Sequence, residues 1–239
     1  MTKPQVRVHE TTEELARDAA RDFAERAESA VAERGRFAVA LAGGSTPEAT
    51  YHVLARDYAG RDFWRHTHAF FGDERTVPPE DTDSNYRMAR EALLDHVEIG
   101  GVYRMKGELT PEMAAAEYER DLQGFFGAAP VFDLVLLGIG SDGHTASLFP
   151  DTPALKVTDR WTVANPVKKL STERITLTAP VINAARAVQF LVAGESKAEA
   201  VAEILEGSSE PSEYPSKMIQ PENGELTWRL DTAAASALE

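Results

Sequence analysis

The sequence predicts an α/β fold, with a doubly wound and mainly parallel sheet flanked by helices. Short apolar runs without helical periodicity, such as residues 37–42 and 132–137, are typical of strands buried on both faces. Segments with helical spacing alternate with these runs nearly throughout the chain. The 239 residues contain no internal repeat and no dividing linker, so we expect one α/β domain over residues 1–239.

Composition limits the partners and the compartment that we expect. The formal net charge is −14, and an acidic chain repels nucleic acid and anionic membranes, so we expect neither as a partner. No apolar stretch approaches the ~20 residues that a membrane helix needs. The N-terminus, MTKPQVRVHE, carries no apolar signal segment, which favours a cytoplasmic protein. Cysteine is absent, which excludes disulfides, thiolate metal sites and cysteine nucleophiles.

The first part of the chain predicts a strand, a helix and a second strand. Residues 6–9 alternate between apolar and polar types, as a half-buried strand does. Thr11 or Thr12 can cap the helix that follows, and its apolar face continues at helical spacing until Gly35. Residues 37–42 then form the next strand, which is apolar on both faces.

A glycine turn connects this second strand to a helix. Its sequence is Gly43-Gly44-Ser45-Thr46-Pro47, and we expect Thr46 to be the N-cap and Pro47 the first helical residue. Free N–H groups and the helix dipole make such a turn a good anion site, to which the two hydroxyls add donors. The alternative is a tight turn and a cap without a ligand. The turn is no P-loop, because no GKS or GKT follows it.

Charged residues follow the third strand directly. Residues 66–72 form this strand, and Asp73, Glu74 and Arg75 come next. A solvated charge cluster is the default interpretation. Parallel strands end at the same edge of a sheet, however, so these side chains should lie at the same rim as His144, which follows a later strand of the predicted sheet.

The strand at residues 132–137 leads into the loop with the strongest chemical signal. The loop contains three glycines, Gly138, Gly140 and Gly143, and it ends at His144, just past the carboxyl end of the strand. The glycines have the GxGxxG spacing of dinucleotide-binding loops, but this is weak evidence for a nicotinamide cofactor, because the loop lies late in the chain. The acidic residue that should follow about 20 residues later would be Asp159, which falls in a polar stretch. A lone histidine is more often structural, but the pair of Asp142 and His144 on a glycine loop favours catalysis.

The remaining elements continue the alternation. We expect helices to begin at Ser84-Asn85, Thr110-Pro111 and Pro180, a helix at 200–205, and strands at 102–105, 160–167, 174–178, 188–192 and 226–230. Lys168, Lys169 and Arg174 form a basic patch, and Lys197 follows a strand, where it is either a surface residue or a phosphate ligand. Residues 207–215 predict a mobile loop, and the alanine-rich tail a short helix at best.

Together, these segments resemble the 6-phosphogluconolactonase family over essentially the whole chain. The most specific match is LLGIGSDGHTASLFP at residues 136–150, whereas the glycine turn is shared with relatives. Further matches are ALAGGSTP at 40–47, GDER at 72–75, Ser84-Asn85, RITLTAPVIN at 174–183, Ser196-Lys197 and the ending around Trp228. The resemblance implies a Rossmann-like fold of the sugar-phosphate isomerase/deaminase type.

The resemblance also implies a reaction, namely hydrolysis of 6-phospho-D-glucono-1,5-lactone in the oxidative pentose phosphate pathway. His144 is then the general base, Asp142 orients it, and Arg75 stabilises the oxyanion or holds ring hydroxyls, with Asp73 and Glu74 fixing it. The phosphate is expected at the glycine turn, with positive charge from two further side chains. These residues are Gly43, Gly44, Ser45, Thr46, Arg174 and Lys197. We expect no metal and no cofactor, and a monomer or a weak dimer.

Two alternatives remain open. Glucosamine-6-phosphate deaminases share the fold, but in their pattern Tyr follows the DE pair and Glu stands five residues after the loop histidine. Arg75 and Phe149 stand at these positions, so the carboxylate that assists ring opening is missing. A non-catalytic sugar-phosphate sensor is the other alternative, and it predicts a DNA-binding segment, for which no room exists before Val6.

Overall fold

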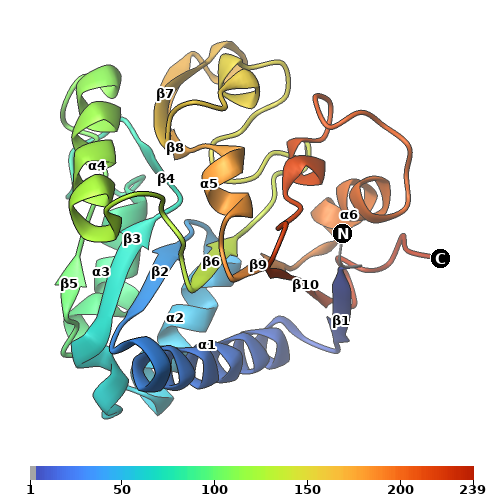
Figure 1. Cartoon of the computed structure of the whole chain (residues 1–239). Coiled ribbons are helices and arrows are strands. Elements are labelled where there is room, and N and C mark those ends of the chain that lie inside the picture. The colour runs from blue at the N-terminus through green and yellow to red at the C-terminus, as the bar shows by residue number, and fades with distance from the viewer. Residues whose placement is uncertain (1–3) are drawn as a thin grey trace.

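A seven-stranded parallel sheet forms the centre of the computed structural model, which describes residues 4–239 (Figure 1). The strand order is β1-β10-β9-β6-β2-β3-β5, and every neighbouring pair in this sheet is parallel. The strands are β1 (Gln5–His9), β2 (Phe37–Leu41), β3 (Thr67–Phe71), β5 (Gly101–Val102), β6 (Leu134–Leu137), β9 (Ala187–Val192) and β10 (Glu225–Asp231).

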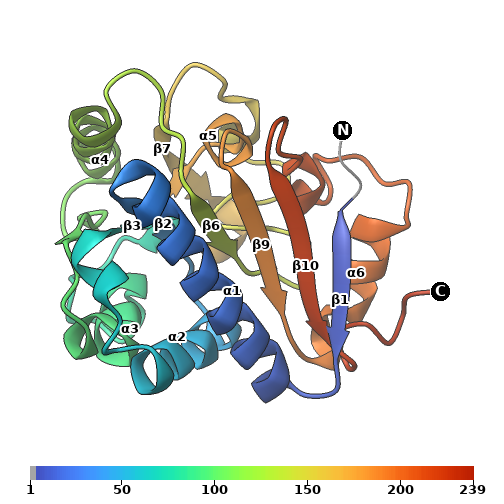
Figure 2. The same ribbon diagram turned by 60° about the horizontal axis from the view of Figure 1, so that its bottom comes forward.

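Helices cover both faces of this sheet (Figures 1 and 2). One face carries α1 (Thr12–Arg34), α2 (Ser45–Asp57) and α3 (Asn85–Ala92), and the other carries α4 (Pro111–Phe126), α5 (Ala179–Asn183) and α6 (Ala198–Leu205). Short 3₁₀ helices are η1 (Asp62–His66), η2 (Leu94–His96), η3 (Pro153–Lys156), η4 (Lys168–Leu170), η5 (Glu195–Lys197) and η6 (Pro215–Met218). The predicted α/β class, with a mainly parallel sheet flanked by helices, is confirmed.

Alternating side chains of the central strands pack into two separate cores. On β2, Phe37, Val39 and Leu41 lie in the core beneath α1 and α2, whereas Ala38 and Ala40 face the core beneath α4 and α5. All five side chains are buried. The uninterrupted apolar run of β2 is therefore explained by burial on both faces of a parallel sheet.

A second, smaller sheet lies beside the first. It has the order β4-β8-β7 and is antiparallel, with β4 (Asp73–Arg75), β7 (Thr162–Val167) and β8 (Thr172–Leu177). Strands were expected in the regions of β7 and β8, but the antiparallel pairing and β4 were not predicted. Three successive charged residues carry no hydrophobic alternation, so β4 is recognised only by its pairing with β8.

The start of α2 corrects the prediction that Thr46 caps this helix. Gly44 is the N-cap and Ser45 the first helical residue, while the Thr46 side chain is buried. The backbone turns at Gly44 with φ of 100°, a conformation that glycine adopts without a steric cost. The helix therefore begins as soon as the glycine turn ends.

Other boundaries differ by a few residues from the prediction. The strand expected at 102–105 is reduced to the two residues of β5, the strand expected from residue 160 begins at Thr162, and α6 begins at Ala198. The alanine-rich tail forms turns.

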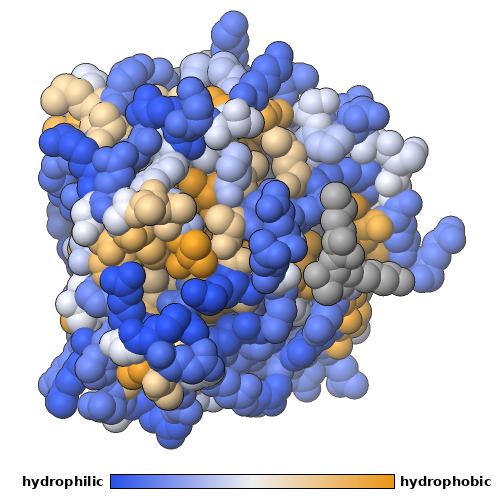
Figure 3. Space-filling view, viewed as in Figure 1, coloured by the Kyte–Doolittle hydropathy of each residue, from blue (hydrophilic) through white to orange (hydrophobic). Residues whose placement is uncertain are grey.

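Within residues 4–239, no helix has both the length and the apolar character to cross a membrane. Figure 3 shows a mostly hydrophilic face. Hydrophobic residues gather left of its centre, in the region between α4 and α1 of Figure 1.

A buried ion pair ties the last strand to the first helix. Arg229 on β10 is fully buried, and its Nε lies 2.9 Å from Asp18 Oδ2 while its Nη2 lies 3.2 Å from Asp22 Oδ1. Burial alone would raise the pKa of Asp18, but the hydrogen bond and charge of Arg229, together with the charge of Arg21, lower that pKa. The carboxylate therefore stays charged inside the fold.

We predict that Arg229→Met lowers the free energy of unfolding by about 3 kcal/mol, because the buried Asp18 and the partly buried Asp22 lose a fully buried cation and keep only more exposed cations, such as Arg21 and Arg26. Urea denaturation followed by circular dichroism measures this change. The matched control is Arg17→Met, which removes an exposed i,i+4 pair with Glu13 and should change stability by less than about 0.5 kcal/mol. Equal effects of the two substitutions would contradict the role assigned to Arg229.

Candidate active site

The candidate site lies where the strand order of the parallel sheet changes direction. From β2 the chain proceeds to β3 on one side, whereas from β6 it proceeds to β9 on the other, so the adjacent carboxyl ends of β2 and β6 form a switch point. A cavity of ≈ 320 Å³ opens there. It is lined by Ala42, Gly43, Gly44, Asp73, Arg75, Asn85, Leu137, Gly138, Ile139, Gly140, His144, Ala146, Ser147, Phe149, Leu170, Arg174 and Lys197.

His144 and Asp142 form a hydrogen-bonded pair in the loop after β6. His144 Nδ1 lies 2.6 Å from Asp142 Oδ1, and Phe149 stacks on the imidazole at 4.0 Å between ring centroids. A Cβ atom at Gly140 would overlap both members of the pair, so only glycine fits there. The hydrogen bond to His144 lowers the pKa of the Asp142 carboxyl well below its usual range, and Lys169, 3.5 Å away, adds to this effect.

The remainder of this loop is fastened to the antiparallel sheet. Ser147 Oγ donates to Asp73 Oδ2 at 2.6 Å, the Ser147 N–H donates to Thr176 Oγ1, and Asn165 Nδ2 donates to the Ser147 carbonyl at 2.8 Å. The Ser147 hydroxyl donates to the Asp73 carboxylate, and among the described residues it makes no hydrogen bond to the imidazole of His144. It is therefore a connecting residue between the loop and β4, and it forms no Ser-His-Asp triad.

Strand alternation separates the three charged residues of β4. Asp73 and Arg75 line the cavity, whereas Glu74 between them does not. Arg174 on β8 is the register partner of Arg75, so two guanidinium groups enter the cavity from adjacent strands. Burial lowers the pKa of Arg174, and the like charge of Arg75 adds to this effect. An anion in the cavity would relieve this repulsion.

Glu74 lies beneath the site and holds the start of α3. Its carboxylate accepts the backbone N–H groups of Arg75, Asn85 and Tyr86 at 2.7–2.8 Å. Burial raises the pKa of Glu74 although these N–H groups oppose the shift. Glu74 thus holds Arg75 through its backbone N–H, whereas the Arg75 guanidinium donates from Nη1 to the carbonyl oxygen of Asp83.

Asn85 connects β4 to the glycine turn. Its Nδ2 donates to the Asp73 carbonyl at 2.9 Å and to Asp73 Oδ1 at 3.2 Å. A Cβ atom at Gly43 would overlap the Asn85 side chain, so glycine is required for this close approach. Asn85 was recognised in the sequence only as a helix start and a family match. Its contact with Asp73 and Gly43 bridges distant parts of the chain, which no local pattern signals.

Three cations at the cavity lack a carboxylate partner. In the chain from residue 4 onward, no Asp or Glu oxygen lies within 4.0 Å of a side-chain nitrogen of Arg75, Arg174 or Lys197. Lys197 reaches the cavity from the start of α6, after the turn at Gly194. Unpaired positive charge gathered in one concavity indicates an anionic ligand. The cluster stands out because the net charge of the chain is −14.

The structure thus brings most of the predicted site residues together. Ser45 and Thr46 do not line the cavity, but they begin α2 beside Gly44, and the first N–H groups of a helix have no acceptor within it. Besides Asn85, the sequence reasoning missed the cavity walls formed by Leu170 and Ile139. Among the described residues, no three His, Asp or Glu side chains converge as a metal site.

Comparisons with known proteins agree with this geometry. The family described as glucosamine-6-phosphate isomerases/6-phosphogluconolactonase matches residues 10–228. A 6-phosphogluconolactonase of Synechocystis is 49% identical over 217 residues, which cover 87% of this chain and 88% of the relative. The human 6-phosphogluconolactonase is 40% identical over 247 residues, covering 98% of this chain and 93% of the relative.

A solved structure shows the same fold. The 6-phosphogluconolactonase of Trypanosoma brucei superimposes with a TM-score of 0.88 at 34% identity and covers 100% of both chains. The resemblance expected from the motifs is thereby confirmed. The chain belongs to the glucosamine-6-phosphate isomerase/6-phosphogluconolactonase family.

Proposed function

We propose that this chain hydrolyses 6-phospho-D-glucono-1,5-lactone to 6-phosphogluconate by attack of a water that His144 activates. The observation that carries the proposal is that His144, hydrogen-bonded to Asp142, lines a cavity whose walls also hold three unpaired cations. A base next to an anion-binding concavity fits a neutral lactone ring that carries a phosphate. The reaction belongs to the oxidative pentose phosphate pathway, as the family resemblance implies.

The substrate phosphate is assigned to the glycine turn. Gly44 lines the cavity at the start of α2, where the N–H groups of Ser45 and Thr46 and the helix dipole favour an anion. Lys197 contributes a point charge, and Arg174, which also lines the cavity, adds positive potential. This local cluster offsets the negative field of the whole chain for an anionic substrate.

The proton transfers follow from the tautomer of His144. Asp142 is ionised and can only accept, so Nδ1 carries the proton of the 2.6 Å bond and Nε2 is free to act as a base. Nε2 removes a proton as water attacks the lactone carbonyl carbon. Arg75 faces the oxyanion that forms. Collapse of this intermediate breaks the bond to the ring oxygen, which takes the proton back from Nε2 and leaves as the C5 hydroxyl.

Phe149 argues for ester hydrolysis and against amino-sugar deamination. The deaminase pattern requires a carboxylate at this position to assist ring opening, whereas here an apolar ring stacks on the imidazole at an interplanar angle of 23°. An aromatic face supplies no proton. It restricts the imidazole and keeps bulk water from one side of it.

We predict that His144→Ala lowers kcat by roughly 10²–10⁴-fold, the usual contribution of a general base. The assay uses freshly generated 6-phosphogluconolactone and is corrected for spontaneous hydrolysis. The control, His52→Ala, removes an exposed histidine of α2 and should retain wild-type activity. Full activity of His144→Ala would exclude His144 as the base, and Asp73 would be tested next.

Lys197→Ala should raise KM for the phosphorylated lactone about 10–100-fold, because one charge-assisted hydrogen bond to the phosphate is lost. We expect a much smaller effect on the unphosphorylated glucono-1,5-lactone. Lys156→Ala is the control, since Lys156 is exposed in η3 and does not line the cavity. An unchanged KM for the phosphorylated substrate would overturn the phosphate assignment.

Asp142→Asn should lower kcat by at least about tenfold, because a neutral amide no longer fixes the tautomer of His144 that leaves Nε2 free. The hydrogen bond with His144 lowers the pKa of Asp142, so the charge that the substitution removes is present at neutral pH, where the assay is run. Wild-type kcat in Asp142→Asn would show that Asp142 does not orient the base.

A further inference from the structure

A segment outside the cavity, residues 214–217, contacts the loop at residues 138–144 that carries His144 and is here called the catalytic loop. Ser216, in η6, is 1% exposed, and both its Oγ and its backbone N–H donate to the Gly143 carbonyl oxygen, at 2.8 and 3.0 Å. Gly143 stands between Asp142 and His144 in the sequence. One buried residue thus fixes the peptide that joins the two members of the catalytic pair.

Tyr214 covers the same glycine. A Cβ atom at Gly143 would overlap the Tyr214 ring and lie 3.2 Å from the Tyr214 Cα, and Gly143 has φ of 73°. The ring therefore packs directly against the Gly143 backbone. Neither Tyr214 nor Ser216 lines the substrate cavity, so neither is placed to touch the substrate.

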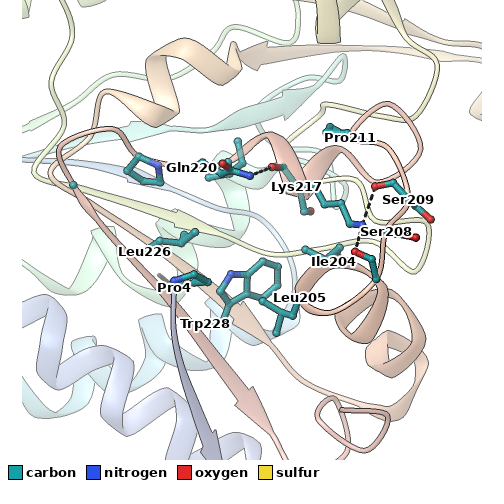
Figure 4. A pocket seen from close by; sticks show the side chains of 15 residues that line it. Pro4, Ile204, Leu205, Ser208, Ser209, Pro211, Lys217, Gln220, Leu226 and Trp228 are labelled. Atoms are coloured by element: carbon teal, nitrogen blue, oxygen red, sulfur yellow. Dashed lines mark hydrogen bonds between the residues drawn. The ribbon is translucent and has the colours of Figure 1, made fainter. Parts of the chain in front are cut away.

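Lys217 anchors this segment on the opposite side. Its Nζ donates to Glu203 Oε1 at 3.0 Å and to the carbonyl oxygens of Gly207 and Ser209 at 3.0 and 2.8 Å. The Ser209 N–H and, after it, Lys217 lower the pKa of Glu203 to about 2, so this carboxylate is ionised at neutral pH. Figure 4 shows Lys217 directed at the loop beside Ser208 and Ser209.

A second cavity, of ≈ 500 Å³, lies beside this segment, and Ser216 is among its lining residues. Figure 4 shows Lys217 and Trp228 in its walls. Ser216 thus lines this cavity and is also hydrogen-bonded to Gly143, so its own hydrogen bonds and those of Lys217 hold the segment in place.

We propose that Tyr214 and Ser216 are positioning residues for His144. They fix Gly143, and with it the orientation in which Asp142 and His144 form their 2.6 Å hydrogen bond. The inference rests on the proposed function, because it concerns the base of that reaction. Its physical basis is the steep dependence of rate on the placement of reacting groups, where an error of about 1 Å can cost a factor of 10².

Two pairs of variants test the proposal on the full chain. Ser216→Ala should lower kcat about 3- to 10-fold, the equivalent of one hydrogen bond, while Ser212→Ala, which alters an exposed serine of the same loop, should not. Tyr214→Ala should lower kcat about 5- to 20-fold, whereas Tyr214→Phe should retain it, since the contact is made by ring carbons. KM should change by less than about twofold in all four variants, because no contact to the substrate is lost.

The Asp142→Asn background separates positioning from a general loss of structure. In that background, Ser216→Ala and Tyr214→Ala should lower kcat by less than about twofold, because the pair that they position is already broken. Folded variants with wild-type kcat overturn the inference. Losses of kcat that are as large in the Asp142→Asn background as in the wild type also overturn it.

The same assays keep the inference distinct from the proposed function. If wild-type protein shows no lactone hydrolysis above background, the proposed function fails. If wild type is active and the variants match it, only the positioning role fails. Should Tyr214→Ala not fold, Ser216→Ala decides the matter alone, because it keeps the backbone N–H bond to Gly143.

Discussion

The hydrogen bond between Asp142 and His144 is the interaction on which the proposed chemistry depends, and it exists because Gly140 has no side chain. An ionised carboxylate at Nδ1 leaves Nε2 as the only ring nitrogen that can accept a proton. Much of the surrounding structure serves this orientation. Ser147 fastens one end of the loop to Asp73, and Ser216 fastens the peptide between the pair from the opposite side.

The parallel sheet determines what surrounds this pair. Because β2, β6 and β9 lie side by side and end at one edge, the glycine turn, the loop after β6 and Lys197 meet there although about 150 residues separate the first from the last. The antiparallel sheet closes the site with Arg75 and Arg174. These cations have no carboxylate partners among the described residues, whereas most arginines elsewhere do. The protein thus keeps a positive concavity on an acidic surface.

The sequence predicted the parts of this arrangement that leave a local trace. Strands buried on both faces leave apolar runs, and the glycine turn and the loop ending in His144 stand out by composition. The N-cap was misassigned to Thr46, because side-chain preference suggested it while the φ of Gly44 decided it. Strand β4 has no hydrophobic pattern and is defined by pairing alone. The contacts of Tyr214 and Ser216 with Gly143 span about 70 residues, and no local sequence pattern predicts them.

A crystal structure of the wild-type protein with the product, 6-phosphogluconate, tests the account most directly. The account predicts the phosphate within about 3.5 Å of the Gly44 N–H and Lys197 Nζ, with the C1 carboxylate beside Nε2 of His144 and Arg75. One oxygen of that carboxylate stands where the attacking water was. A product bound in the reverse direction, with its phosphate at His144, or bound outside this cavity, would contradict the assignment of the site.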